Sequence, residues 1–257
     1  MNADVVLSTH SLTVDIGDIS VCDNLDLTIS PGQMWAILGS NGAGKTTLLH
    51  TLAGLREPNR GAVALAGQAI DQFSRRQIAQ RVGVLFQDCN DPYPATVLET
   101  VLIGRHPYLS AWQWENAADI DLATQALQAV GLDTLQDRIV DTLSGGERRR
   151  LAMATLLAQD PDIALLDEPL NHLDLRYQMD ILNLLRRRVD SGQHAVMIIL
   201  HDVNLAARFC DHAVLLHHGK VQQGPTSGIL DSNAIEQLYG YPVHQVDAPG
   251  GRVFVPT

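Results

Sequence analysis

Four short runs of apolar residues constrain the fold of this chain more than any other feature of its sequence. They are "MWAILG" (34–39), "VGVLFQ" (82–87), "IALLD" (163–167) and "AVMIILHD" (195–202). Each run is continuous rather than alternating, and each has the length of a strand that is buried on both faces. The pattern therefore predicts an α/β fold built on a parallel sheet that helices cover.

Segments on either side of these runs have the pattern of antiparallel strands. Before the first run, "LTVDI" (12–16) and "SVCDNLDLTI" (20–29) alternate like half-buried strands and end at the turn "SPGQ". After the last run, residues 212–224 predict a hairpin that turns at His218 and Gly219. We therefore expect antiparallel strands beside the parallel sheet.

A single domain over residues 1–257 is expected, because no internal repeat or low-complexity segment divides the chain. Residues 1–87 and 161–225 would supply its core. Residues 88–160 are mostly helical in pattern and are expected to form an insertion within that core. The extension at 226–257 ends in a β-rich stretch, to which the sequence assigns no chemistry.

Composition argues against several classes of protein. With 257 residues, 46% of them hydrophobic, the chain can bury a sizeable core. Its 18 basic and 29 acidic residues leave a net charge of −11, so nucleic acid and anionic membranes are poor partners. Three widely spaced cysteines argue against a disulfide framework or a zinc site and suit a reducing cytosol. No apolar stretch approaches the roughly 18 residues of a membrane span, so we expect the chain not to cross a bilayer alone.

The segment "GSNGAGKTT" joins the first apolar run to a helical pattern and has the spacing of a phosphate-binding loop. Its glycines let backbone N–H groups point at phosphate oxygens, and the following helix adds its positive end. Lys45 would reach the β- and γ-phosphates, and the Thr46 hydroxyl would hold Mg²⁺. The alternative is a glycine-rich turn with no ligand. The expected phosphate-binding residues are Gly39, Ser40, Asn41, Gly42, Ala43, Gly44, Lys45, Thr46 and Thr47.

Two adjacent carboxylates follow the third apolar run. Asp167 and Glu168 stand at the carboxyl end of a buried strand, where open α/β sheets place their ligands. Asp167 can position Mg²⁺, and Glu168 can orient and deprotonate an attacking water. The alternative for Glu168 is an acidic residue that the positive end of a helix favours.

A second glycine motif, "LSGGE" (143–147), begins another predicted helix. Ser144 and Glu147 have the spacing of a capping box, so the simplest function of this motif is to start the helix. Gly145 and Gly146 are poor helix formers and cost up to about 1 kcal/mol each relative to alanine. Their small size leaves backbone N–H groups open to an anion from outside.

These motifs together resemble the ATP-binding subunit of ABC transporters, over a span from about residue 5 to 225. The resemblance rests on "GSNGAGKTT", Gln87, "LSGGE", "IALLDEP", "HLD" and His201, in that order. It implies a P-loop NTPase (RecA-like) core with an antiparallel β-subdomain and a helical insertion. It also implies that the chain hydrolyses ATP with Mg²⁺.

The family resemblance further implies a head-to-tail dimer of two copies. In that dimer, Ser144, Gly145 and Gly146 of one copy contact the γ-phosphate that the other copy's loop binds. Asp174 would lie at the seam between the copies. Each chain would then supply two half-sites, and two chains would complete two whole sites.

Within one copy, the resemblance assigns Gln87 to sensing Mg²⁺ and the water, and His201 to contacting the γ-phosphate. Ile16 stands where the family usually stacks an aromatic residue on adenine. We therefore expect loose base selectivity, because a stacking contribution of about 0.5–1.5 kcal/mol is missing. The implied catalytic residues are Lys45, Gln87, Glu168 and His201, and the implied metal-site residues are Thr46, Gln87 and Asp167.

A weaker likeness points to the importer branch that serves iron-siderophores, haem and cobalamin. It rests on residues 101–113, 171–178 and 201–221. It implies two transmembrane permease subunits, an indirectly acting periplasmic or lipoprotein binding protein, and a peripheral place at the cytoplasmic face of the inner membrane. The expected permease contact is Val101–Trp114, because Tyr108, Leu109, Trp112 and Trp114 concentrate apolar area there. The alternative is that these side chains pack inside the helical insertion.

Two rival functions fit the sequence less well. A soluble ABC protein of DNA repair or translation, acting as a nucleotide-gated clamp, usually carries long coiled-coil arms or two ATPase units, and this chain has neither. A phosphate-loop kinase would leave "LSGGE" unexplained. The arginine triplets at 148–150 and 186–188 are expected to lie on solvated helix faces rather than to bind nucleic acid.

Overall fold

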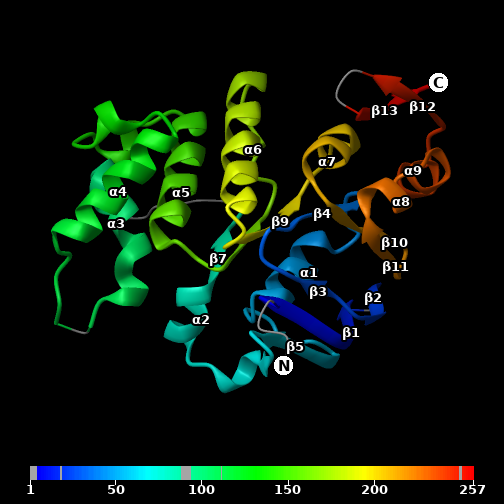
Figure 1. Ribbon diagram of the computed structural model, residues 1–257, viewed down its shortest axis with the longest axis horizontal. Helices are drawn as coiled ribbons and strands as arrows, with labels where there is room; N and C mark the ends of the chain where they lie inside the picture. Colours follow the sequence, from blue (N-terminus) through cyan, green and yellow to red (C-terminus); the bar gives the residue numbers. More distant parts are fainter. Residues whose placement is uncertain (1–4, 18, 88–93, 111, 249–250) are drawn as a thin grey trace.

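The main sheet of the protein has six strands in the order β11-β10-β4-β9-β8-β7. We describe it from a computed structural model, which covers residues 5–17, 19–87, 94–110, 112–248 and 251–257 (Figure 1). The strands are β4 (Met34–Gly39), β7 (Val82–Leu85), β8 (Ile163–Leu166), β9 (Ala195–Ile199), β10 (His212–His217) and β11 (Lys220–Pro225). All are parallel except β11, which pairs antiparallel with β10. The four apolar runs thus form neighbouring parallel strands, which confirms the predicted α/β fold class.

Both faces of this sheet are buried, as the continuous apolar runs require. In β4, Met34, Ala36 and Leu38 pack into one core, whereas Trp35 and Ile37 pack into the core on the opposite face. A strand covered on both faces has no solvent-facing positions for polar residues, and this explains the absence of alternation.

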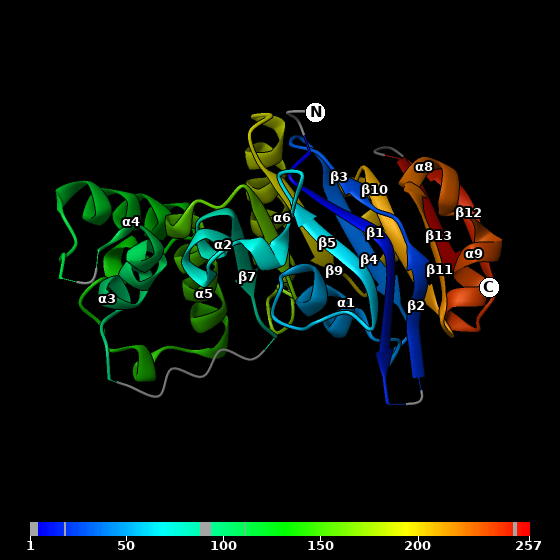
Figure 2. The same ribbon diagram turned by 90° about the horizontal axis from the view of Figure 1, so that it is seen from below.

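An antiparallel sheet covers one face of the main sheet. Its path is β2-β1-β5-β6, and β3 pairs with β1 off this path. These strands are β1 (Leu7–Ile16), β2 (Ile19–Leu25), β3 (Thr28–Ile29), β5 (Arg60–Leu65) and β6 (Gln68–Ala69). Their buried side chains share one core with the buried side chains of helix α1 (Lys45–Leu52). Figure 2 shows the ribbons of these strands and of α1.

Helices cover the other face and extend beyond it at one end of the molecule. The helices of the chain besides α1 are α2 (Arg75–Arg81), α3 (Val97–Leu102), α4 (Ala117–Ala129), α5 (Gly145–Gln159), α6 (Leu175–Asp190), α7 (Val203–Phe209), α8 (Thr226–Ile229) and α9 (Ser232–Tyr239). Of these, α2 packs through Ile78 on the same core as α1 rather than on the other face. Short 3-10 segments add Ile70–Gln72, Ile103–Tyr108, Asp133–Leu135 and Val140–Thr142. The helices α3, α4 and α5 gather at the green end in Figure 1. The exact limits of the expected insertion stay a prediction, and residues 88–93 lie outside the described residues.

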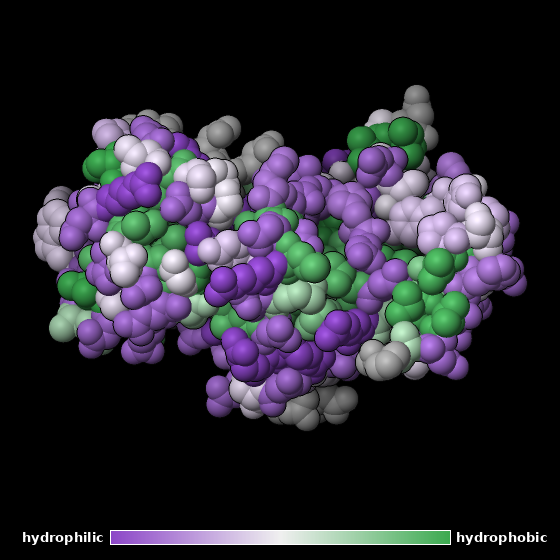
Figure 3. Space-filling model, turned by 90° about the horizontal axis from the view of Figure 1, so that it is seen from above, coloured by the Kyte–Doolittle hydropathy of each residue, from purple (hydrophilic) through white to green (hydrophobic). Residues whose placement is uncertain are grey.

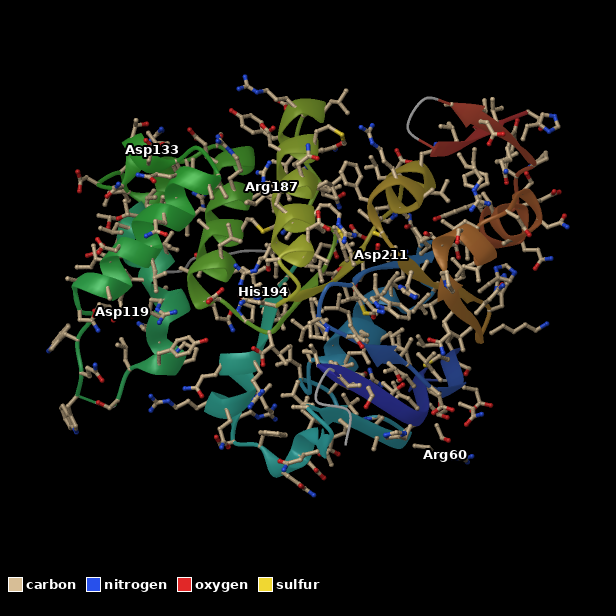
Figure 4. All side chains as sticks on the ribbon, in the orientation of Figure 1. Arg60, Asp119, Asp133, Arg187, His194 and Asp211 are labelled. Carbon is tan, nitrogen blue, oxygen red and sulfur yellow. The ribbon has the colours of Figure 1, made fainter. Side chains whose placement is uncertain are left out.

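A buried ion pair stabilises this helical end. The Arg105 guanidinium lies 3.0 Å from the Asp119 carboxylate at the start of α4, and it also donates to the carbonyl oxygen of Ala158 in α5 at 2.9 Å. Asp119 is labelled in Figure 4. Hydrogen bonds from Arg105 and from the Asn116 backbone lower the pKa of Asp119 against the opposing effect of its burial. The carboxylate therefore stays charged and holds the 3-10 turn to two helices.

The end of the chain folds back beside α7. The hairpin of β12 (Val243–Ala248) and β13 (Gly251–Pro256) follows α9, and the Asn204 side chain of α7 exchanges hydrogen bonds with the backbone of Phe254. Among the described residues, no helix combines the length and hydropathy needed to span a bilayer. On the face in Figure 3, hydrophobic side chains lie in small groups between hydrophilic ones.

Candidate active site

The predicted phosphate loop lies between β4 and α1, at the carboxyl edge of the main sheet. Gly44 has a φ of 89°, and a Cβ atom there would lie 2.4 Å from the Val21 side chain. A Cβ atom at Gly39 would lie 2.7 Å from the Leu216 carbonyl oxygen. Glycine is therefore required at both positions by the surrounding fold itself.

Lys45, the first residue of α1, is buried beneath this loop. Its Nζ donates to the carbonyl oxygens of Gly39 at 2.8 Å and Ser40 at 3.0 Å. Burial lowers the pKa of Lys45, while the nearby Glu168 and Asp167 oppose that shift. The ammonium group thus lies where the loop and the positive end of α1 converge, which suits a phosphate group.

Asp167 follows β8 and is fully buried, at 0% exposure. Neither of its carboxylate oxygens has a hydrogen-bond partner among the residues that the structure describes. Burial raises its pKa, and the Thr46 side chain, which faces the carboxylate without completing a hydrogen bond, opposes the rise. An unpartnered buried carboxylate beside a hydroxyl group offers the oxygen ligands that Mg²⁺ prefers. These two residues therefore fit the predicted metal site.

Three side chains surround the carboxylate of Glu168. His201 Nε2 lies 2.7 Å from Oε1, Gln87 Nε2 donates to Oε2 at 3.2 Å, and Asn171 Nδ2 donates to Oε2 at 2.5 Å. Gln87, Glu168 and His201 follow β7, β8 and β9, whose carboxyl ends lie at one edge of the sheet. The structure thus brings together three predicted residues. It adds Asn171, which sequence analysis missed and which only its position three residues after Glu168 could have indicated.

Arg149 corrects the expectation that the arginine triplets lie on solvated faces. It is only 8% exposed, and its guanidinium donates to carbonyl oxygens that follow β7 and β8. The carboxyl ends of strands leave carbonyl groups beyond the ladder, and five N–H donors can satisfy them. A signal was present, because Met153 and Leu156 follow at i+4 and i+7 and mark the buried face of α5.

The second triplet is also paired rather than solvated, except for Arg187, which is exposed. Arg186 lies 2.7 Å from the Asp190 carboxylate and 2.9 Å from that of Asp211. Arg188 pairs with Asp160. These ion pairs form because the triplet lies where α6 meets the segments before β8 and β10. Figure 4 labels Arg187 and Asp211.

The signature turn, residues 143–147, begins α5 with the capping box that its spacing predicts. The Ser144 side chain accepts from the Glu147 N–H, and the Glu147 carboxylate accepts from the Ser144 N–H at 2.7 Å. A Cβ atom at Gly145 would have no neighbour within 4 Å among the described residues, and at Gly146 the nearest would be 3.7 Å away. Neither glycine has a positive φ. The residues that the structure describes therefore do not require glycine here.

Two further predicted residues, Ile16 and Asp174, lie outside the cluster around Glu168. Ile16 ends β1 and pairs with Ile19 of β2, and these side chains are 38% and 60% exposed. Ile19 is two residues before Val21, which packs on Gly44, so this pair borders the phosphate loop. Asp174 caps α6, where its side chain accepts from the Tyr177 N–H at 3.0 Å. Capping is the ordinary role of an aspartate directly before a helix.

Comparison with known proteins supports the resemblance to ATP-binding subunits of ABC transporters. A family model described as "ABC transporter" matches residues 22–171, more than half of the chain. The sequence is 39% identical to the ferric enterobactin transport ATP-binding protein FepC of Escherichia coli (strain K12), covering 95% of this chain and 90% of that protein. It is also 39% identical to the hemin import ATP-binding protein HmuV of Rhodopseudomonas palustris (strain BisB18), covering 91% of this chain and 87% of that protein. Among solved structures, a metal-chelate type ABC transporter in an inward-facing conformation is similar with a TM-score of 0.86 and 28% identity, covering 99% of this chain and 98% of that one.

Proposed function

The chain belongs to the ABC transporter family, as an ATP-binding subunit that hydrolyses ATP, and on this premise we propose that it powers the import of an iron chelate. Iron-siderophore or haem is the cargo class, because the relatives named above are a ferric enterobactin transport protein and a hemin import protein. Cobalamin stays a prediction of the sequence resemblance. The soluble clamp of DNA repair or translation has less support, because these relatives are transport and import subunits.

Hydrolysis is proposed to use the cluster around Glu168. A water attacks the γ-phosphorus, the bond from the γ-phosphorus to the oxygen that bridges it to the β-phosphate breaks, and ADP leaves with that oxygen. The Glu168 carboxylate accepts a proton from the attacking water, and inorganic phosphate is the second product. Gln87, Asn171 and His201 hold the carboxylate in place. Lys45 exchanges its carbonyl partners for phosphate oxygens. Mg²⁺ bound by Thr46 and Asp167 would neutralise phosphate charge, and Gln87 would lie beside it.

A second copy is proposed to complete each ATP site, as the family resemblance implies. The supporting observation is that no residue described by the structure gives Gly145 or Gly146 a steric purpose. The helices α5 and α1, which begin at the two glycine motifs, also lie apart in both ribbon views (Figures 1 and 2). The Ser144 turn and Asp174 would therefore contact the nucleotide bound by the partner.

Mixing two inactive variants tests this dimer. Lys45→Ala removes the phosphate-loop half of a site, and Gly145→Asp places a negative charge in the other half, where a first-turn acid suits its own helix. Each variant alone should lose turnover. An equal mixture should recover about a quarter of wild-type activity, since half of the dimers carry one intact site of two. A mixture of Lys45→Ala with Thr46→Ala is the control, because both variants lack the phosphate-loop half of a site and no pairing of them restores it. Recovery in the control, or none in the test mixture, would contradict the proposal.

The permease contact is proposed for Val101–Trp114, at the cytoplasmic face of the inner membrane. Trp112 and Trp114 are 96% and 86% exposed, so packing inside the insertion is wrong for both. Tyr108 is instead half-buried, with its hydroxyl donating to the Gln80 carbonyl oxygen at 3.1 Å. Ala111 lies outside the described residues. A Trp112→Ala, Trp114→Ala double variant should keep its ATPase activity and fail to co-purify with the permease; retained co-purification would contradict this contact.

A further inference from the structure

Glu168 has a backbone conformation that its own residue type does not favour. Its φ is 47°, in the left-handed region where residues other than glycine are uncommon. Such a conformation persists only when neighbouring groups hold it. In this conformation the carboxylate meets Gln87, Asn171 and His201. The geometry of the hydrolytic cluster therefore depends on whatever fixes the backbone at this position.

The guanidinium of Arg149 contacts the backbone on both sides of Glu168. Nη2 donates to the carbonyl oxygens of Asp167 at 2.7 Å and Glu168 at 2.5 Å, and Nε donates to that of Pro169 at 3.2 Å. These three successive carbonyl groups span the left-handed residue. A planar group bonded to all of them fixes the local chain direction, because its donors cannot rotate independently.

The same guanidinium also holds the neighbouring strand end. Nη1 donates to the carbonyl oxygens of Phe86 at 2.7 Å and Gln87 at 3.0 Å. Phe86 and Gln87 directly follow β7, which pairs with β8. One side chain thus sets the spacing between the backbone segments that carry Gln87 and Glu168. Lysine would not reproduce this pattern, because its three donors lie on one atom, whereas the guanidinium presents Nε, Nη1 and Nη2 to five carbonyl oxygens in a fixed plane.

Arg149 also connects the cluster to the signature turn. It lies in the second turn of α5, five residues after Ser144. The signature turn is proposed to contact the partner's nucleotide. One helix turn and the buried Arg149 side chain therefore join it to Glu168 of the same chain. We propose that Arg149 is a positioning residue for ATP hydrolysis, which holds the Glu168 backbone and links it to the signature turn. The inference rests on the proposed role of Glu168 as the group that activates water.

Steady-state kinetics of Arg149→Lys and Arg149→Gln test the proposal. We expect kcat to fall roughly 10- to 100-fold, since small displacements of a catalytic group have effects of this size, while KM for Mg-ATP changes little. Arg150→Lys is the matched control. Arg150 is the next residue of α5, and its guanidinium also donates to carbonyl oxygens, those of Val130 and Gly131, away from Glu168. The control should keep wild-type kcat. Unchanged kcat in both Arg149 variants would overturn the proposal.

Repeating the substitution in the Glu168→Gln variant separates a positioning role of Arg149 from a general disturbance of the fold. In Glu168→Gln, Arg149→Lys should cause no further loss of single-turnover hydrolysis, because the group that it positions is already gone. An equal loss in both backgrounds would overturn the proposal and leave the function intact. If Glu168→Gln itself keeps wild-type turnover, the proposed role of Glu168 fails instead.

Hydrogen exchange gives a readout that is independent of turnover. In folded Arg149→Lys, exchange should rise at residues 167–171 and stay unchanged in α1. If Arg149→Gln does not fold, hydrogen exchange in the conservative variant Arg149→Lys still tests whether Arg149 holds the Glu168 backbone. Unchanged exchange at 167–171 would contradict the proposal.

Discussion

The two glycine motifs of this protein differ in what requires their glycines. At the phosphate loop, Val21 and the Leu216 carbonyl oxygen leave no room for a side chain at Gly44 and Gly39. At the signature turn, Gly145 faces open space among the described residues and has an ordinary backbone conformation. The first motif is thus shaped by its own chain. In the second, a capping box explains the shape of the turn, but no described residue explains the choice of glycine, and this supports a ligand or partner from outside.

The largest effect is expected when ATP still binds between the two motifs but is no longer hydrolysed. Glu168→Gln should lower turnover about 10²- to 10⁴-fold, the usual contribution of a general base, while ATP still binds. ATP should then hold two copies together, because the bond whose cleavage would release them stays intact. Size-exclusion chromatography with and without Mg-ATP measures this. Glu236→Gln, at an exposed position on α9, is the control. A monomer with ATP would contradict the conclusion that the second motif serves a partner.

Alanine at each glycine sharpens the comparison directly. Gly44→Ala should destabilise the chain by roughly 1–3 kcal/mol, because the backbone is left-handed and the added methyl group meets Val21. Gly145→Ala should be neutral, or stabilise by about 0.5–1 kcal/mol through helix propensity, yet lower the turnover of the dimer. Urea unfolding measures both free energies. If Gly145→Ala were as destabilising as Gly44→Ala, the difference between the motifs would disappear.

Asp167, which faces the phosphate loop through Thr46, offers a test of the cost of burying a charged group beside the first motif. Because burial raises the folded-state pKa above the unfolded value, its contribution to stability is largest below the unfolded pKa and is lost as pH rises through the folded one. Asp167→Asn should therefore stabilise the chain by about 1 kcal/mol at pH 7, and less as the pH falls. Urea unfolding across pH measures this. A gain that is the same at all pH values would contradict it.

The smallest expected effect concerns the base. Ile16→Tyr should add a stacking contribution of about 0.5–1.5 kcal/mol and tighten Mg-ATP binding roughly 2- to 12-fold. Fluorescence titration of the nucleotide measures the affinity. The control is Ile120→Tyr, at an exposed position on α4. Unchanged affinity for Ile16→Tyr would show that the β1–β2 turn does not border the base.

Sequence analysis predicted the segments whose chemistry is local. The phosphate loop, the capping box at Ser144 and the turn at His218 and Gly219 all depend on neighbours within a few residues. It missed Asn171 and misplaced Arg149, whose partners are set by packing between α5 and the strand ends. The periodicity of α5 marks Arg149 as inward-facing, but periodicity alone does not show which carbonyl groups it meets.

The sequence by itself determined that this chain forms a parallel sheet with a phosphate loop at its first buried strand, because strand burial and loop spacing are properties of short segments. Only the tertiary structure decided that Gln87, Asn171 and His201 meet around the Glu168 carboxylate. It also decided that Arg149 bonds the backbone of Glu168. Strand order sets these contacts. Residues distant along the chain become neighbours only when the sheet is assembled, and a local sequence pattern does not show which of them will be in contact.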